Sequence, residues 1–302
     1  MTESLDRNPA AEGAAADAIV AALRSALRGR LDSAAREVLR GFESSRGRPT
    51  VPVDEDRVAQ FVRRNWTAVR GLLKRRHAQV RQAALWALAT DRSARVAGPI
   101  LELLLDQRHF FDHDFAYVAA RRVGAPLVPP LERAALRGSG LRRKFAIHCL
   151  GSTRAGRPAV AALRRIVRRH GFGDGVLNAL YNVHHAEAIA LAAGALDDPE
   201  PNVRLDAMGA VLAGLEAKGA PLAASRRSSL VRRVLRAMED PQTWQVAQDP
   251  WASLFGFGLE VLQHLDPAAA RDFALRCAAN GAHPEVLDEL RPYLPKRRRG
   301  AK

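Results

Sequence analysis

The sequence has little of what several classes of protein depend on. Cysteine occurs only twice, as Cys149 and Cys277, so a disulfide scaffold and a CxxC metal motif are both excluded. Aromatic residues make up 6% of the 302 residues, which disfavours a sheet built on aromatic and β-branched pairs. No stretch approaches the roughly 18 uncharged apolar residues of a membrane-spanning helix. These absences favour a helical protein without covalent cross-links or a membrane span.

Signals for cofactor chemistry and for export are also missing. The chain has no P-loop, no Rossmann glycine pattern, and neither a G-x-S-x-G nor an H-E-x-x-H motif, so we expect no cofactor. The stretch from His109 to Asp114 has an H-x3-H spacing that would suit a metal on a helix, but a capping loop is the favoured interpretation. Acidic residues before the first apolar run are wrong for a signal peptide. We therefore expect a cytoplasmic protein with two buried thiols.

Alanine, leucine and arginine fill most of the chain, and apolar residues make up 47% of it. This mixture favours helix, and the apolar residues recur at a spacing of three to four. We therefore predict an all-α fold with more than about 60% helix.

The periodicity divides the chain into four parts. Residues 1–16 lack it and are predicted to be a disordered lead. Residues 17–48 form an N-terminal helical region, and residues 53–294 form a helical array whose first helix starts near Asp54. Residues 295–302 are a basic tail, which typically strengthens anion binding without specificity.

The helical array repeats itself loosely. Its segments share a small residue at one register, at intervals of 26 to 36 residues, which is the length of two short helices and two turns. After most of these helices comes a Gly or Pro break and a second apolar helix, as at Pro99, Pro130 and Pro158. A small side chain lets the paired helix approach closely. The shared positions are Ala84, Ala120, Ala146, Ala179 and Ala207.

Two of the segments carry a nameable pattern. Asp197-Asp198-Pro199 is followed by Val203, Arg204 and Ala207, and the first unit has Val80-Arg81-x-x-Ala84. This pattern resembles HEAT repeats of the bacterial type. The resemblance implies a right-handed α-solenoid of about six to seven helical hairpins, which works as a binding scaffold rather than as an enzyme. The alternative is an ordinary helical bundle whose alanines repeat only by composition.

Positive charge is concentrated in blocks. The formal net charge is +15, which normally indicates an anionic partner. Residues 57–92 hold nine basic residues against one acid, and residues 133–171 hold eleven and no acid. Arginine enrichment from a GC-rich genome would spread evenly along the chain. The clustering therefore favours an acidic protein or a nucleic acid backbone as the partner.

Two predicted helices carry arginine stripes opposite their apolar faces. In HEAT-like stacks the second helices of the hairpins line the concave side, and both stripes fall on second helices. Forked guanidinium donors there would meet phosphates, although a merely solvated helix face is the alternative. The predicted contact residues are Arg164, Arg165, Arg168, Arg169, Arg232, Arg233 and Arg236.

A second function belongs to a different class. The HEAT-like alkylpurine DNA glycosylases use tryptophans and an aspartate in a concave cleft, and they are similar in size and basic character. The only candidates for such a site here are Trp86, Asp91, Trp244 and Asp249. Their surroundings do not reproduce the local motif of that family, and packing tryptophans are the alternative interpretation.

Overall fold

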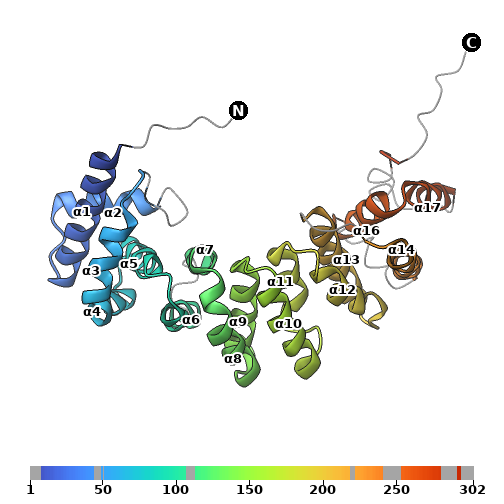
Figure 1. The fold of residues 1–302 in the computed structure, drawn as a ribbon, viewed down its shortest axis with the longest axis horizontal. Helices are drawn as coiled ribbons and strands as arrows, with labels where there is room; N and C mark the ends of the chain where they lie inside the picture. The colour runs from blue at the N-terminus through green and yellow to red at the C-terminus, as the bar shows by residue number, and fades with distance from the viewer. Residues whose placement is uncertain are drawn as a thin grey trace, which may run out of the picture. The chain divides into compact units, whose positions relative to one another are not determined.

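A computed structural model describes residues 8–43, 49, 51–106, 113–217, 222–240, 253–279 and 291–293. Helix accounts for 81% of the structure, and no described residue lies in a strand, so the all-α prediction is confirmed (Figure 1). The chain forms two compact units, Met1–Arg169 and His170–Lys302. The helical array predicted for residues 53–294 runs through both units. The division falls just before a turn in which Gly171 and Gly175 have positive φ.

Unit 1 is a succession of helices of 6 to 19 residues. Three 3-10 turns join them: Leu72–Lys74 (η1), Ala94–Val96 (η2) and Ala125–Leu127 (η4). The α-helices are α1 Pro9–Leu27, α2 Ser33–Glu43, α3 Glu55–Arg64, α4 Trp66–Gly71, α5 Ala78–Thr90, α6 Ala97–Leu105, α7 His113–Val123, α8 Val128–Arg137, α9 Gly140–Ser152 and α10 Arg157–His170.

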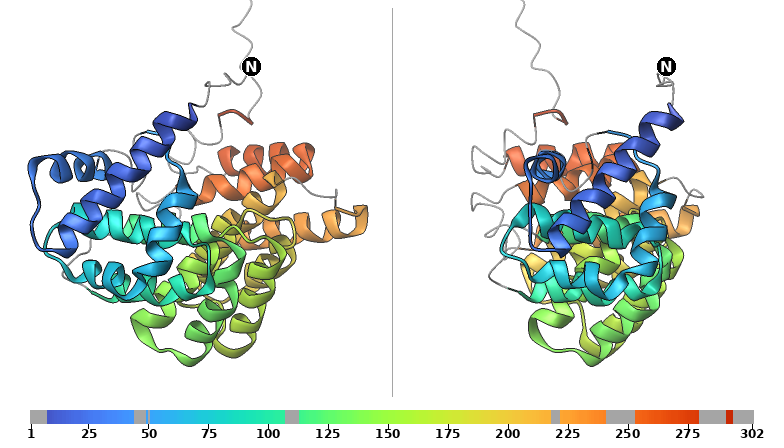
Figure 2. Two further views of the ribbon diagram at one scale, coloured as in Figure 1. Left: turned by 60° about the vertical axis from the view of Figure 1, so that its left-hand side comes forward. Right: turned by 90° about the vertical axis from the view of Figure 1, so that its left-hand side faces the viewer.

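The N-terminal region differs from its prediction in two ways. A helix already begins at Pro9, because the side chain of Asn8 accepts hydrogen bonds from Ala10 N and Ala11 N, so the disordered lead does not extend to residue 16. The helical region predicted for residues 17–48 is also divided into two helices at Gly29, whose φ is +72°. The start of the next helix at Asp54 is confirmed, since this side chain caps α3. In Figure 2 the dark-blue α1 lies against α2 and α3 of the same unit.

Unit 2 is organised around one long helix. Its elements are α11 Val176–Val183, α12 Ala188–Ala192, η5 Ala193–Asp197, α13 Pro201–Glu216, α14 Ala224–Glu239, α16 Ser253–Leu265 and α17 Pro267–Ala279. Helix α13 packs against α11, α12, η5 and α16. Glycine makes these approaches possible: a Cβ at Gly214 would lie 2.5 Å from Ile189 Cγ1.

The five alanines that define the repeat are all fully buried. Each lies on the first helix of a predicted hairpin, on α5, α7, α9, α11 and α13 in turn. The residue four places later is buried at Leu88, Leu150, Val183 and Val211. In α7 the residue four places after the alanine is Gly124. Its φ of +71° is incompatible with an α-helix, so α7 ends just before it.

An arginine three places before the alanine makes the same kind of contact in three helices; it is buried at Arg81 and Arg204 and half-buried at Arg143. Arg81 donates to the carbonyls of Arg75 and Arg76, at 2.8 and 2.7 Å. Arg204 donates in the same way to Asp198 O and Pro199 O, at 2.7 and 2.9 Å. Arg143, where the sequence has no Val-Arg pair, donates to Gly138 O at 3.0 Å. The arginine therefore fastens the loop before its helix in three hairpins, not only in the two that the sequence pattern identifies.

Overpacking at the repeat alanine is expected to be costly. The Ala207 side chain has no exposed surface, so Ala207→Leu should lower the free energy of unfolding by about 1–3 kcal/mol. Ala268→Leu, at an exposed position on α17, should change it by less than about 0.5 kcal/mol. Urea denaturation followed by circular dichroism compares the two. Equal stabilities would show that Ala207 does not lie at a tight helix contact.

Candidate polyanion-binding site

The first arginine stripe lies on α10, as predicted. Val160, Leu163 and Ile166 of this helix are fully buried, whereas Val167 is only half-buried. The arginines lie off this apolar face. Arg164 is half-buried, and the other three are exposed, namely Arg165, Arg168 and Arg169.

One arginine of this stripe is occupied by a carboxylate. Arg165 forms a two-pronged ion pair with Glu132 of α8, in which Nη2 donates to Oε2 at 2.8 Å. Hydrogen bonding to this carboxylate raises the pKa of Arg165. The Glu132 side chain is only 14% exposed. Arg165 therefore serves to join two helices, and less of its charge is available to a partner.

Similar pairs connect other second helices about one repeat apart. Arg70 of α4 pairs with Glu102 of α6, 32 residues on, and Arg276 of α17 pairs with Glu239 of α14, 37 residues back. The Arg165 and Glu132 pair spans 33 residues. These ion pairs join α4 to α6, α8 to α10 and α14 to α17 through long side chains.

The ion pair extends the stripe onto α8. Arg133 and Arg137 of that helix are exposed and lie one turn apart on the helix that Arg165 contacts. Sequence reasoning missed them, although the repeat length would place residues near 133 beside those near 166. Among the described residues, no carboxylate lies within 4 Å of the following five arginines: Arg133, Arg137, Arg164, Arg168 and Arg169. We call these five the α8–α10 arginine cluster.

The second stripe is on α14 and belongs to the other unit. Arg232 and Arg236 are exposed, and Arg233 is half-buried. Arg233 donates to Asp197 Oδ2 at 2.6 Å, and Arg236 lies 3.9 Å from the same carboxylate. The seven predicted arginines are therefore divided between the two units, with four on α10 and three on α14. Of the second stripe, Arg232 keeps its charge free of any carboxylate within the described residues.

A comparison with protein-family models and with curated proteins returns no match. Function has to be inferred from the side chains and their surroundings.

Of the four residues proposed for a glycosylase site, the structure describes Trp86 and Asp91. Trp86 is 3% exposed, packs edge-on against Phe42 at 5.5 Å between ring centroids, and has the guanidinium of Arg122 over its ring at 4.7 Å. A tryptophan buried in this way cannot stack on a base. Trp244 and Asp249 lie outside the described residues.

Asp91 has a structural environment. Its carboxylate is 6% exposed and lies 3.0 Å from both Arg63 Nε and Arg95 Nε, with Ser93 Oγ as a further donor. Burial alone would raise the pKa of Asp91, but the hydrogen bonds from Ser93, Arg95 and Arg63 outweigh it and lower the pKa below its ordinary value. Asp91 therefore stays ionised and ties α3 to the turn after α5.

Loss of this carboxylate is expected to destabilise unit 1 in a pH-dependent way. Because the folded pKa of Asp91 is lowered, its contribution is present above the unfolded pKa of about 3.9 and is lost as the pH falls through the folded pKa. Asp91→Asn should lower the free energy of unfolding by about 1–3 kcal/mol at pH 7 and by less at pH 3. Urea denaturation at the two pH values measures this, with the exposed Asp114→Asn as control. A difference that is the same at both pH values would contradict the assignment.

The remaining sequence candidates give no further site. Cys149 and Cys277 are buried free thiols, as predicted, and burial raises the pKa of Cys277 to about 11. Groups of three or more metal-ligating side chains are absent from the described residues. His109 to Asp112 and the tail 295–302 lie outside them. Within the same part of the chain, no helix has the length and apolarity to cross a membrane.

Proposed function

We propose that this protein is a non-enzymatic HEAT-type scaffold that binds the backbone of a nucleic acid through the α8–α10 arginine cluster. The observation that carries the proposal is the charge balance of that surface. Five arginines lie on two helices joined by an ion pair, and the carboxylate of that pair, Glu132, is already occupied by Arg165. An unbalanced set of guanidinium groups attracts phosphates, because each contact releases condensed counterions.

The nature of the partner follows from what accompanies the arginines. Protein interfaces are usually centred on buried aromatic or other apolar anchors. The exposed large apolar residues of the described structure are Val51, Leu141, Tyr181 and Leu275, and none of these is on α8 or α10. A surface of arginines without apolar anchors or stacking rings suits contact with phosphates rather than reading of bases. An acidic protein is the alternative that the experiment must separate.

The scaffold part of the proposal is a right-handed solenoid whose second helices form a concave binding face. Two observations support it. The loop-fastening arginine recurs in three hairpins, at Arg81, Arg143 and Arg204, and ion pairs one repeat apart join successive second helices. In such a solenoid α8 and α10 would be neighbouring second helices. A nucleic acid backbone that crosses both helices could then contact the arginines of each.

Electrophoretic mobility shifts across a salt series test this function. The protein should shift single- and double-stranded DNA and RNA without sequence preference, and the affinity should fall steeply with salt. Poly-glutamate serves as a flexible carboxylate polymer of similar charge. Binding of poly-glutamate as tight as that of nucleic acid would indicate an acidic protein partner, and the absence of any salt-sensitive shift would overturn the proposal.

A further inference from the structure

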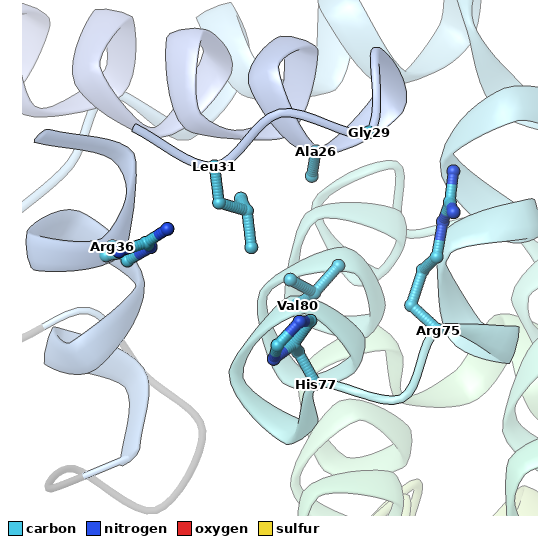
Figure 3. Close-up of a pocket in the computed structure, with 7 residues that line it drawn as sticks. All are labelled: Ala26, Gly29, Leu31, Arg36, Arg75, His77 and Val80. Carbon is cyan, nitrogen blue, oxygen red and sulfur yellow. The ribbon is translucent and has the colours of Figure 1, made fainter. Parts of the chain in front are cut away.

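A pocket at the other end of unit 1 lies between the α1–α2 loop and the start of α5. It has a volume of about 330 Å³, and Figure 3 shows it with Arg36 on one side and Arg75 on the other. Leu31 and Val80 lie between these two side chains. A second cavity of about 280 Å³ shares Leu31, Arg36, His77 and Val80 with it and adds Leu39, Arg40 and Gln79 to the lining. The two cavities are therefore parts of one cleft.

The lining combines an apolar floor with cationic walls. Val80 and Leu39 are buried, and Leu31 is half-buried, whereas Arg36 and Arg75 are exposed and have no ion pair within the described residues. His77 also borders the cleft, and its side chain does not cap α5. Neither cavity has a carboxylate in its lining. Arg40, which lines the second cavity, forms an ion pair with Glu37 at 3.3 Å.

We propose that this cleft binds a small phosphate monoester carried on an apolar or planar ring. Arg36 and Arg75, on opposite walls of the cleft, would attract and bind the phosphate, and Leu31 and Val80 would cover the ring. Guanidinium forks match the oxygens of phosphates and carboxylates alike. A cleft with arginines on two of its walls and no carboxylate in its lining favours the group of higher charge, and a phosphate monoester carries about −1.5 to −2 at pH 7. The apolar floor excludes inorganic phosphate as the full ligand, because that ion would leave it uncovered.

This site is independent of the proposed nucleic-acid surface, since none of its residues belongs to α8 or α10. A phosphorylated small molecule there would make the scaffold responsive to a metabolite. The side chain of His77 forms no capping hydrogen bond to the backbone N–H groups at the start of α5. These N–H groups add to the attraction for an anion.

Isothermal titration calorimetry with 1-naphthyl phosphate on the full chain tests the proposal. We expect saturable binding of one molecule per chain, with 1-naphthoate, 1-naphthol and inorganic phosphate each at least about tenfold weaker, because each lacks part of the ligand. Arg36→Gln with Arg75→Gln should weaken binding by about tenfold or more. Both side chains are exposed, so the variant should keep the circular dichroism spectrum of the parent.

The matched control removes the same charge from neighbouring positions. Arg28→Gln with Arg76→Gln alters exposed arginines that border the same loops but do not line the cleft, and binding should change by less than about threefold. Equal losses in the two double variants, or no saturable binding of 1-naphthyl phosphate, would overturn the proposal. Equal affinity for 1-naphthoate would also overturn it, in favour of a carboxylate site. Arg164→Gln with Arg168→Gln should leave this binding unchanged, which separates the two sites.

Discussion

Arg204→Met should lower the free energy of unfolding of unit 2 by about 2–4 kcal/mol. The Arg204 side chain is 7% exposed and donates to Asp198 O, to Pro199 O and, at 2.6 Å, to Asp240 Oδ1. Methionine fills a similar volume but donates nothing, so two carbonyls and a carboxylate lose their donor. Because the two carbonyls belong to the loop before α13 and Asp240 follows α14, the variant loosens two elements at once.

The control for this prediction is Arg232→Met, at an exposed arginine of the same unit, which should cost less than about 0.5 kcal/mol. Arg204→Lys should fall between the two, since one ammonium group cannot reach three acceptors in the geometry of a planar fork. Urea denaturation followed by circular dichroism measures all three variants. If Arg204→Met were as stable as Arg232→Met, the fastening role assigned to the recurring arginine would be wrong.

Replacing Arg164, Arg168 and Arg169 with glutamine should reduce the slope of log K against log salt by about 2–3 for a nucleic acid, at about 0.7–0.9 per lost phosphate contact. The affinity at moderate salt should fall by about tenfold or more. These arginines lie off the buried face of α10, so the fold should persist. Fluorescence anisotropy of a labelled oligonucleotide, titrated at several salt concentrations, gives the slope directly.

Two comparisons sharpen this experiment. Arg28→Gln, Arg64→Gln and Arg271→Gln together remove the same charge from exposed positions outside α8, α10 and α14, and they should change the slope by less than about one. Arg165→Gln alone should matter less than Arg168→Gln alone, because Arg165 is paired with Glu132. Equal losses in the two triple variants would show diffuse attraction, and no loss in either would leave the stripe as a solvated helix face.

The sequence specified the helices and the buried alanine register without help from tertiary structure. Ala84, Ala120, Ala146, Ala179 and Ala207 are all buried because apolar periodicity is a local property that survives into the folded chain. The N-cap at Asp54 could also be predicted from the sequence, because a capping side chain bonds only to the backbone of the next two or three residues. The break at Gly29 was missed, because a glycine within a periodic pattern is compatible with helix and with a turn.

Which arginines are free was decided only by the tertiary structure. Arg165 and Arg168 both belong to the arginine stripe of α10 and are both exposed, yet Arg165 is paired with Glu132, 33 residues earlier on α8, and Arg168 has no carboxylate within 4 Å among the described residues. The third fastening arginine, Arg143, lacks the valine that marks the other two, so only its hydrogen bonds to Gly138 O identify it. The cleft between Arg36 and Arg75 joins segments about 40 residues apart. Local sequence sets the helical periodicity and the caps, whereas ion pairs and cavities depend on which helices lie side by side, and that is determined by packing between distant segments.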